Sequence, residues 1–172
     1  TAGNRALFPN GDLEWDSGAL LRTPLQLRAD LHVQARIYAP FAGRPSAARL
    51  SFALVVAMPA GSIDRSAPRV NPVIGVQWDG ASGNLTYSVG QESFSEPAAG
   101  LGAATANSHL VSIATRGDVV TFSVDGVVRR ESSLTYLGAA IGSPVQLWIG
   151  GRATGGSVAV SNVDVDVASR AI

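Results

Sequence analysis

Hydrophobic and polar residues alternate along several short segments of the chain. Within residues 30–38 every second residue is apolar, beginning at Leu31, and the residues between them are polar. The same alternation recurs in residues 84–89 and 118–125. Because successive side chains of a β-strand point to opposite faces, this pattern predicts half-buried strands. Residues 49–57 are almost continuously apolar, as in a central strand that is covered on both faces.

The other apolar runs are bounded by turn residues. They predict six further strands: Ala19–Leu27, Val73–Asp79, Ser108–Thr115, Val127–Glu131, Val145–Gly150 and Ser157–Val167. The last run changes phase, and one extra residue near Ser161–Asn162, a β-bulge, would place Val160 and Val163 on the same core face. Asp125-Gly126 between two apolar runs is typical of a hairpin turn.

No window of the sequence shows sustained helical spacing with caps. The strands must therefore bury their apolar faces against each other, which predicts an all-β protein, either a two-sheet sandwich or a closed barrel. Three longer connections, Met58–Asn71, Gln91–Asn107 and Ser132–Pro144, have the length of functional or mobile loops. Neither a repeat nor a linker divides the chain, so we expect one domain over residues 1–172.

Composition excludes several kinds of site. The chain has 13 basic and 13 acidic residues, and this neutral balance argues against a nucleic-acid partner. Cysteine is absent and only two histidines are present, so we expect no metal centre and no cofactor. Asp79 and Asp125 are expected to form turns by bonding nearby backbone amides rather than to bind calcium. No apolar run approaches the roughly 20 residues that a membrane span requires.

The first residue and the type of basic residue bear on the origin of the protein. The chain starts at Thr1 rather than at methionine, so we expect a removed signal peptide, a tag or a flanking domain ahead of it. All 13 basic residues are arginine, which is typical of a GC-rich bacterial genome. We therefore expect a bacterial protein with an extracytoplasmic location, in the periplasm, on the cell surface or secreted.

Three segments in the second half of the chain are similar to one fold family. Val119–Val127 resembles the penultimate hairpin of the concanavalin A-like (laminin G-like) jelly rolls, Leu147–Gly151 resembles their L-x-I-G-G strand, and Ser161–Val167 is similar to their closing strand. Ser17–Pro40 is similar more loosely to the opening pair of strands. The resemblance implies a two-sheet antiparallel jelly-roll sandwich with one concave and one convex face. Members of the family include lectins, glycan hydrolases, adhesion modules and structural domains, so the fold does not decide the function.

One acidic run has the composition of a catalytic site. Asp12, Glu14 and Asp16 occupy alternate positions and would share one face of a strand. The glycan-hydrolysing relatives carry a comparable run in a cleft, where one carboxylate attacks the sugar and another donates a proton. Here the run lies near the N-terminus and begins with aspartate where the family has glutamate. We therefore interpret it as a solvated acidic edge, and expect neither a catalytic residue nor enzyme activity.

The aromatic residues divide between core and surface. Trp78 shares the phase of its apolar neighbours and is expected in the core, whereas Trp148 has the opposite phase to Leu147 and lies beside Gln146. Tyr38 likewise belongs to the polar set of its strand. If the two strands share a sheet, Tyr38, Gln146 and Trp148 form a face that could stack sugars or contact a protein. The alternative is that Trp148 packs under a long loop.

Three functions are compatible with these observations. The first is a non-catalytic, extracytoplasmic interaction module, an accessory or structural subunit that docks on a larger cell-envelope or membrane-anchored assembly of protein partners. Its expected contacts are Arg65, Arg69 and Tyr136, because arginine and tyrosine are enriched at interfaces. The second is a lectin-like carbohydrate-binding module that uses Tyr38, Gln146 and Trp148. The third is a glycan hydrolase of the same fold that uses the acidic run.

Overall fold

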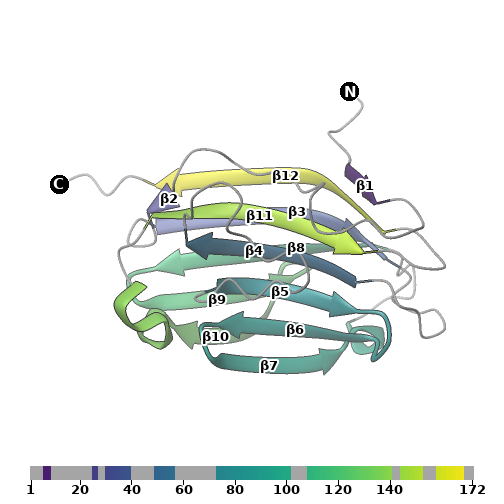
Figure 1. Cartoon of the computed structure of the whole chain (residues 1–172), viewed down its shortest axis with the longest axis horizontal. Coiled ribbons are helices and arrows are strands. Elements are labelled where there is room, and N and C mark those ends of the chain that lie inside the picture. Colours follow the sequence, from purple (N-terminus) through teal and green to yellow (C-terminus); the bar gives the residue numbers. More distant parts are fainter. Residues whose placement is uncertain are drawn as a thin grey trace.

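The chain folds into two antiparallel sheets, each of six strands (Figure 1). The computed structural model describes residues 6–8, 25–26, 30–39, 49–56, 73–101, 108–140, 144–152 and 158–168. In one sheet the strands follow the order β2 (Leu25–Gln26), β11 (Pro144–Arg152), β4 (Arg49–Val56), β5 (Val73–Asp79), β6 (Asn84–Val89) and β7 (Glu92–Pro97). In the other the order is β1 (Ala6–Phe8), β12 (Val158–Ala168), β3 (Asp30–Tyr38), β8 (Ser108–Arg116), β9 (Val119–Val124) and β10 (Val127–Ser133). This arrangement confirms the all-β, two-sheet expectation.

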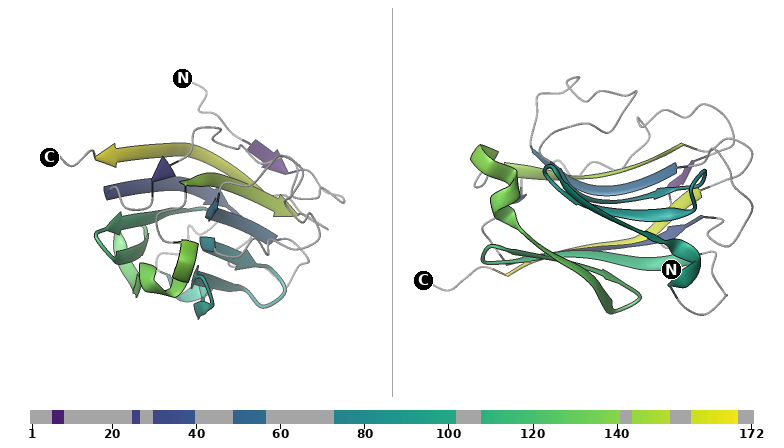
Figure 2. Two further views of the ribbon diagram at one scale, coloured as in Figure 1. Left: turned by 60° about the vertical axis from the view of Figure 1, so that its left-hand side comes forward. Right: turned by 90° about the horizontal axis from the view of Figure 1, so that it is seen from below.

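The two sheets curve in the same direction, so their outer faces differ. The right-hand view of Figure 2 shows β4, β5 and β6 bowed toward the other sheet at their centres, which makes the outer face of their sheet concave. We call this sheet, β2-β11-β4-β5-β6-β7, the concave sheet, and the other, β1-β12-β3-β8-β9-β10, the convex sheet. Strand twist produces such curvature whenever two sheets pack face to face.

The core lies between the sheets and is built by the alternating residues that the sequence indicates. Val33 and Ile37 of the convex sheet belong to the same core cluster as Phe52 and Trp78 of the concave sheet, and each of these four side chains is at most 2% exposed. Burial of an aliphatic or aromatic side chain contributes about 1.5–3 kcal/mol, so the alternation itself drives the two faces together. The prediction that Trp78 belongs to the core is confirmed.

Several local predictions are also confirmed. Strands β3, β5 and β6 have the bounds expected from their alternation. The pairing of β12 with β3 shifts register between Ser161 and Asp164, which is the predicted bulge. Strand β4 is covered on both faces, since Ser51 and Ala53 are buried as well as Phe52. These features depend on short stretches of chain, where periodicity and turn chemistry act directly.

Two of the expected long loops contain regular structure. The segment Gln91–Asn107 begins with β7 and continues into η2 (Ala98–Gly100), while Ser132–Pro144 contains η3 (Leu134–Ala140). Strand β7 was not predicted, because its inward positions include Glu92 and Glu96 and it therefore lacks the apolar row that indicates a strand.

Other expectations concern residues outside the described part of the chain. The loop Met58–Asn71 lies there, as does most of the predicted strand Ala19–Leu27. The expectation of a single domain stays a prediction. Among the residues that the structure describes, no helix is long and apolar enough to cross a membrane.

Candidate functional site

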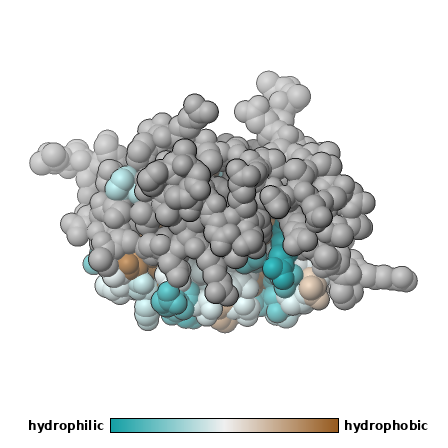
Figure 3. Space-filling model, viewed as in Figure 1, coloured by the Kyte–Doolittle hydropathy of each residue, from teal (hydrophilic) through white to brown (hydrophobic). Residues whose placement is uncertain are grey.

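The outer face of the concave sheet carries small and neutral polar side chains. In β4, β5 and β6 its positions alternate with buried apolar residues, so they face away from the core. Two neighbouring register rows across β4, β5, β6 and β7 consist of Ala53, Gly75, Ser88 and Ser93 in one row, and Ser51, Gln77, Thr86 and Ser95 in the other. We call these eight residues the polar face. In Figure 3, seen from this side, the described side chains appear mainly along the lower edge, where pale and teal surface is mixed with a few brown residues.

The polar face is buried over β4 and accessible toward β7. A Cβ atom added at Gly75 would lie 2.9 Å from the Cβ of Ala53, so there is no room for a side chain at position 75. Ser88 is half-buried, whereas Ser93 and Ser95 are exposed. The Thr86 and Ser95 hydroxyls are hydrogen-bonded across β6 and β7, with 2.7 Å between their oxygens. The face is therefore closed at Ser51, Ala53 and Gly75, which are buried, and open over β6 and β7, where it offers hydroxyl groups.

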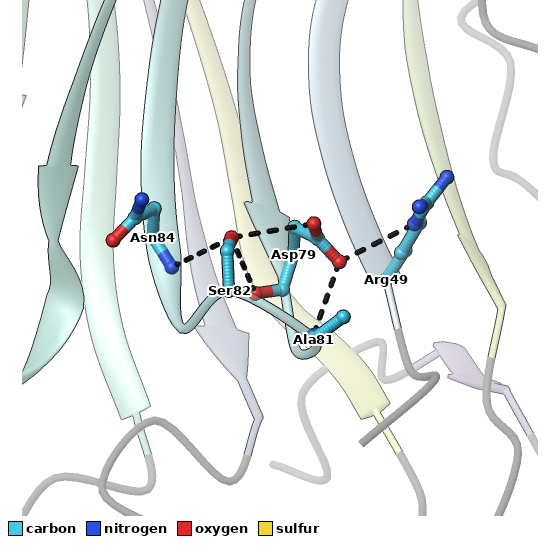
Figure 4. A network of polar contacts seen from close by, with 5 residues as sticks. All are labelled: Arg49, Asp79, Ala81, Ser82 and Asn84. Carbon is cyan, nitrogen blue, oxygen red and sulfur yellow. Dashed lines mark hydrogen bonds and ion pairs between the residues drawn. The ribbon is translucent and has the colours of Figure 1, made fainter. Parts of the chain in front are cut away.

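A network of polar contacts closes one end of the polar face (Figure 4). The Asp79 carboxylate accepts hydrogen bonds from the Ala81 N–H at 3.1 Å, the Ser82 hydroxyl at 3.2 Å and Arg49 Nε at 3.3 Å. The Ser82 hydroxyl in turn accepts the Asn84 N–H at 3.4 Å. Asp79 thus holds the β5–β6 turn, as expected from the sequence, and is occupied by three donors.

Asp125 was expected to act in the same way at the β9–β10 hairpin. Its Oδ1 accepts the backbone N–H of Leu110 at 2.8 Å, and its Oδ2 lies 2.6 Å from Nδ1 of the buried His109. Asp125 therefore binds a backbone amide of the neighbouring strand β8 rather than one within its own turn. In the part of the chain described, no group of three or more His, Asp or Glu side chains is placed to hold a metal ion.

Two ion pairs join the edge strands β7 and β10 and close that edge of the sandwich. Arg129 binds Glu96, with Nε 2.9 Å from Oε1, and Arg130 binds Glu92, with 3.2 Å between nitrogen and oxygen. Two consecutive side chains of a regular strand would point to opposite faces. Both arginines reach β7 because the pairing of β10 with β9 shifts register between Val128 and Arg130. We call these four residues the edge clasp.

The edge clasp extends into the core through Tyr87. The buried Tyr87 hydroxyl donates to Glu96 Oε1 at 2.6 Å, and its ring lies 5.5 Å from that of Phe122. Burial raises the pKa of the Tyr87 phenol, and the bond to Glu96 raises it further. The hydrogen bond from Arg129 lowers the pKa of Glu96, and the same bond raises the pKa of Arg129. Each group is therefore held in its ordinary charge state, as in a structural contact.

The structure separates the residues expected to form one aromatic face. Tyr38 belongs to β3 of the convex sheet, whereas Gln146 and Trp148 belong to β11 of the concave sheet. The condition that these strands share a sheet is not met, because strand order is set by long-range pairing that alternation does not encode. In β11, Trp148 is paired with Ala53 of the polar face, but the side chains of Gln146 and Trp148 lie outside the described part.

The remaining candidate residues fall in different places. Tyr136 lies on η3 and is 51% exposed, beside the buried Leu134 and Leu137 of the same element. Arg65 and Arg69 lie outside the described residues, and so do the acidic positions Asp12, Glu14 and Asp16.

Inspection of the sequence did not single out the polar face. Its residues appear in the sequence only as the polar phase of four separate strands. The available signal was their chemistry: Ser88 and Thr86 on β6 and Gln77 on β5 are uncharged, where solvated strand faces usually carry charged residues.

Comparisons with known proteins give structural matches only. Neither a protein-family model nor a curated protein matches the chain. A β-glucanase from Bacillus licheniformis matches with a TM-score of 0.59 and 13% identity, over 96% of this chain and 78% of that one. An endo-β-1,3-glucanase from Pyrococcus furiosus matches with a TM-score of 0.59 and 18% identity, over 88% and 66%. A galectin from Caenorhabditis elegans matches with a TM-score of 0.53 and 11% identity, over 93% and 95%.

These neighbours correct one expectation. Most of the similar structures are glycoside hydrolases and polysaccharide lyases, including alginate lyases, which contradicts the expectation that the chain is not an enzyme. That expectation rested on the lack of a coherent catalytic set in the sequence. A lone acidic run says little about catalysis, because catalytic groups are brought together by the fold. At 18% identity or less, these three matches show the fold.

Proposed function

We propose that this chain, whose fold is the concanavalin A-like jelly-roll sandwich, is a carbohydrate-active protein that binds a glycan chain on its polar face. The neighbours in this fold act on or are named for carbohydrate: glucanases, alginate lyases and a galectin. Likeness of fold leaves function to be argued from the site.

The observation that carries the proposal is the composition and shape of the polar face. Serine and threonine hydroxyls and the Gln77 amide both donate and accept hydrogen bonds, which suits a ligand covered with hydroxyl groups. Ser51, Ala53 and Gly75 are buried, so the part of the polar face that is open to a glycan lies over β6 and β7, where Ser88 is half-buried and Ser93 and Ser95 are exposed. Concave, largely preformed surfaces with a few convergent polar groups are the usual form of ligand sites.

A bulky substitution on the accessible part of the polar face tests this proposal. Ser88→Phe on β6 places a ring in the middle of the polar face, and we expect it to weaken glycan binding by at least about tenfold. The matched control is Ser112→Phe, since Ser112 is also a half-buried serine on an outer face, but of the convex sheet. Binding is measured by affinity electrophoresis in soluble β-1,3-glucan and by calorimetry. Equal effects of the two substitutions would contradict the proposal.

A second substitution guards against misfolding. Ser95→Phe changes an exposed residue on the edge strand β7, where an added ring meets solvent rather than core. We expect this variant to keep the melting temperature of the unaltered protein and to bind glycan less tightly. Unchanged affinity in a folded Ser95→Phe protein would also count against the polar face.

Cleavage of the bound glycan is the second candidate function, and the hydrolase and lyase neighbours favour it. Hydrolysis of a glycosidic bond requires two carboxyl groups, one as acid and one as base or nucleophile. Asp79 is a poor choice because three donors occupy it. We propose Asp12, Glu14 and Asp16 as the source of the pair. Release of reducing ends from β-1,3-glucan, abolished by Glu14→Gln with binding retained, would support this candidate, and no release by the unaltered protein would contradict it.

Protein docking and location form a separate part of the proposal. We propose that the exposed Tyr136 contacts a protein partner, and that the protein works outside the cytoplasm, where polysaccharide chains are found. Co-purification from the native source, compared between the unaltered protein and Tyr136→Ala, tests the first point. Fractionation of the same cells tests the second.

A further inference from the structure

We infer that the glycan recognised by the polar face is an uncharged polysaccharide, and that polyuronates and sulfated chains are not its ligands. This inference rests on the proposed function and adds the chemical class of the ligand. It starts from the distribution of charge over the two sheets.

Every charged side chain of β4, β5, β6 and β7 is engaged in an ion pair. Arg49 pairs with Asp79 at one end of the polar face. Glu92 and Glu96 are held by Arg130 and Arg129 in the edge clasp. Each ion pair leaves little net charge. The two rows of the polar face contain only small or neutral residues. Strands β4, β5, β6 and β7 therefore carry no charged side chain outside these ion pairs.

The convex sheet, by contrast, carries exposed charged side chains. Asp164 and Asp166 are exposed on β12, Arg116 is exposed at the end of β8, and Glu131 is exposed on β10. Solvated strand faces normally carry such residues, which also discourage edge-to-edge association. The neutrality of the polar face is thus a property of that face, not of the composition as a whole.

Neutral hydroxyl and amide groups suit a neutral ligand for an energetic reason. A carboxylate or sulfate that leaves water loses strong solvation, and cations are needed to restore it. Along the polar face the described residues offer hydroxyls, such as those of Thr86, Ser88 and Ser95, and the Gln77 amide. These groups replace the hydrogen bonds that sugar hydroxyls make to water, but they do not compensate a full negative charge.

Ligand charge and salt dependence test the inference together. The full chain is run by affinity electrophoresis in gels that contain soluble β-1,3-glucan, galactomannan, alginate or chondroitin sulfate, at about 0.05 M and about 0.5 M salt. We expect retardation by a neutral polymer, a change in affinity of less than about twofold between the two salt concentrations, and no retardation by either anionic polymer. Ser88→Phe should abolish the retardation and Ser112→Phe should not.

The possible outcomes separate this inference from the proposed function. Retardation by alginate or chondroitin sulfate that falls by about tenfold or more at high salt would overturn the neutral class, yet leave glycan binding in place. Retardation by a neutral polymer that is unaffected by Ser88→Phe would overturn the assignment to the polar face. Retardation by none of the polymers would refute the proposed function and this inference with it.

Discussion

The edge clasp gives the sharpest test of the interactions that hold the sandwich closed. Glu96→Gln keeps the size of the side chain and removes its charge. Glu96 is 13% exposed, accepts the hydroxyl of the buried Tyr87 at 2.6 Å, and pairs with Arg129. The matched control is Glu92→Gln on the same strand, whose partner Arg130 lies at 3.2 Å and is 41% exposed.

The two substitutions should differ because the two carboxylates differ in burial. A hydrogen bond from a buried group to a charged acceptor contributes about 1.5–3 kcal/mol, and an exposed ion pair about 0.2–1 kcal/mol. Since a glutamine retains a weaker neutral bond to Tyr87, we expect Glu96→Gln to lower the free energy of unfolding by about 2 kcal/mol. Glu92→Gln should lower it by about 0.5 kcal/mol.

The pH dependence provides a second, independent readout. Arg129 lowers the pKa of Glu96 in the folded state, so the unfolded chain binds the proton more tightly. The stabilisation is therefore complete above the unfolded pKa of about 4.3, and is lost as the pH falls through the lower folded value. Urea denaturation at neutral pH and in acid should show the difference between the unaltered protein and Glu96→Gln shrinking below about pH 4. Equal losses for the two substitutions, or a difference that persists in acid, would refute this reasoning.

Two further predictions concern turns. Gly90 has φ of 58°, and a Cβ there would collide with the Tyr136 carbonyl oxygen, so Gly90→Ala should lower the free energy of unfolding by more than about 2 kcal/mol. The control is Gly83→Ala: Gly83 has φ of 71° with no atom near its Cβ position, so this substitution should lower the free energy of unfolding by only about 1 kcal/mol. Equal melting temperatures for the two variants would contradict the packing of η3 against the turn at Gly90. Asp79→Ala removes an acceptor of three hydrogen bonds and should cost about 1–2 kcal/mol in urea denaturation, whereas no measurable loss would mean that the turn forms without it.

Parts of the candidate site could be predicted from single strands. The polar phases of β5 and β6 are visible in the sequence, and the turn-forming role of Asp79 follows from Asp79-Gly80 between two apolar runs. What could not be predicted is that Gln77, Thr86 and Ser95 lie in one row, since that depends on the registers of β5 with β6 and of β6 with β7.

The edge clasp also depends on contacts between distant residues, which a single strand does not reveal. Glu92 and Glu96 made β7 look like a loop, because inward-facing charge is read as solvent exposure when only one strand is considered. Their partners, Arg129 and Arg130, are more than 30 positions away along the chain. The separation of Tyr38 from Trp148 into different sheets has the same origin.

The amino-acid sequence by itself determined the all-β class, the bounds of β3, β5 and β6, the bulge near Ser161 and the burial of Trp78. Each of these depends on neighbours a few residues apart, where the two-residue repeat of a strand and the chemistry of a turn act directly. Only the tertiary structure decided strand order, the neutral polar face and the edge clasp. These depend on which distant strands pair. The alternation within a strand shows which of its faces is buried but not which strand lies beside it, so strand order is decided by the whole chain.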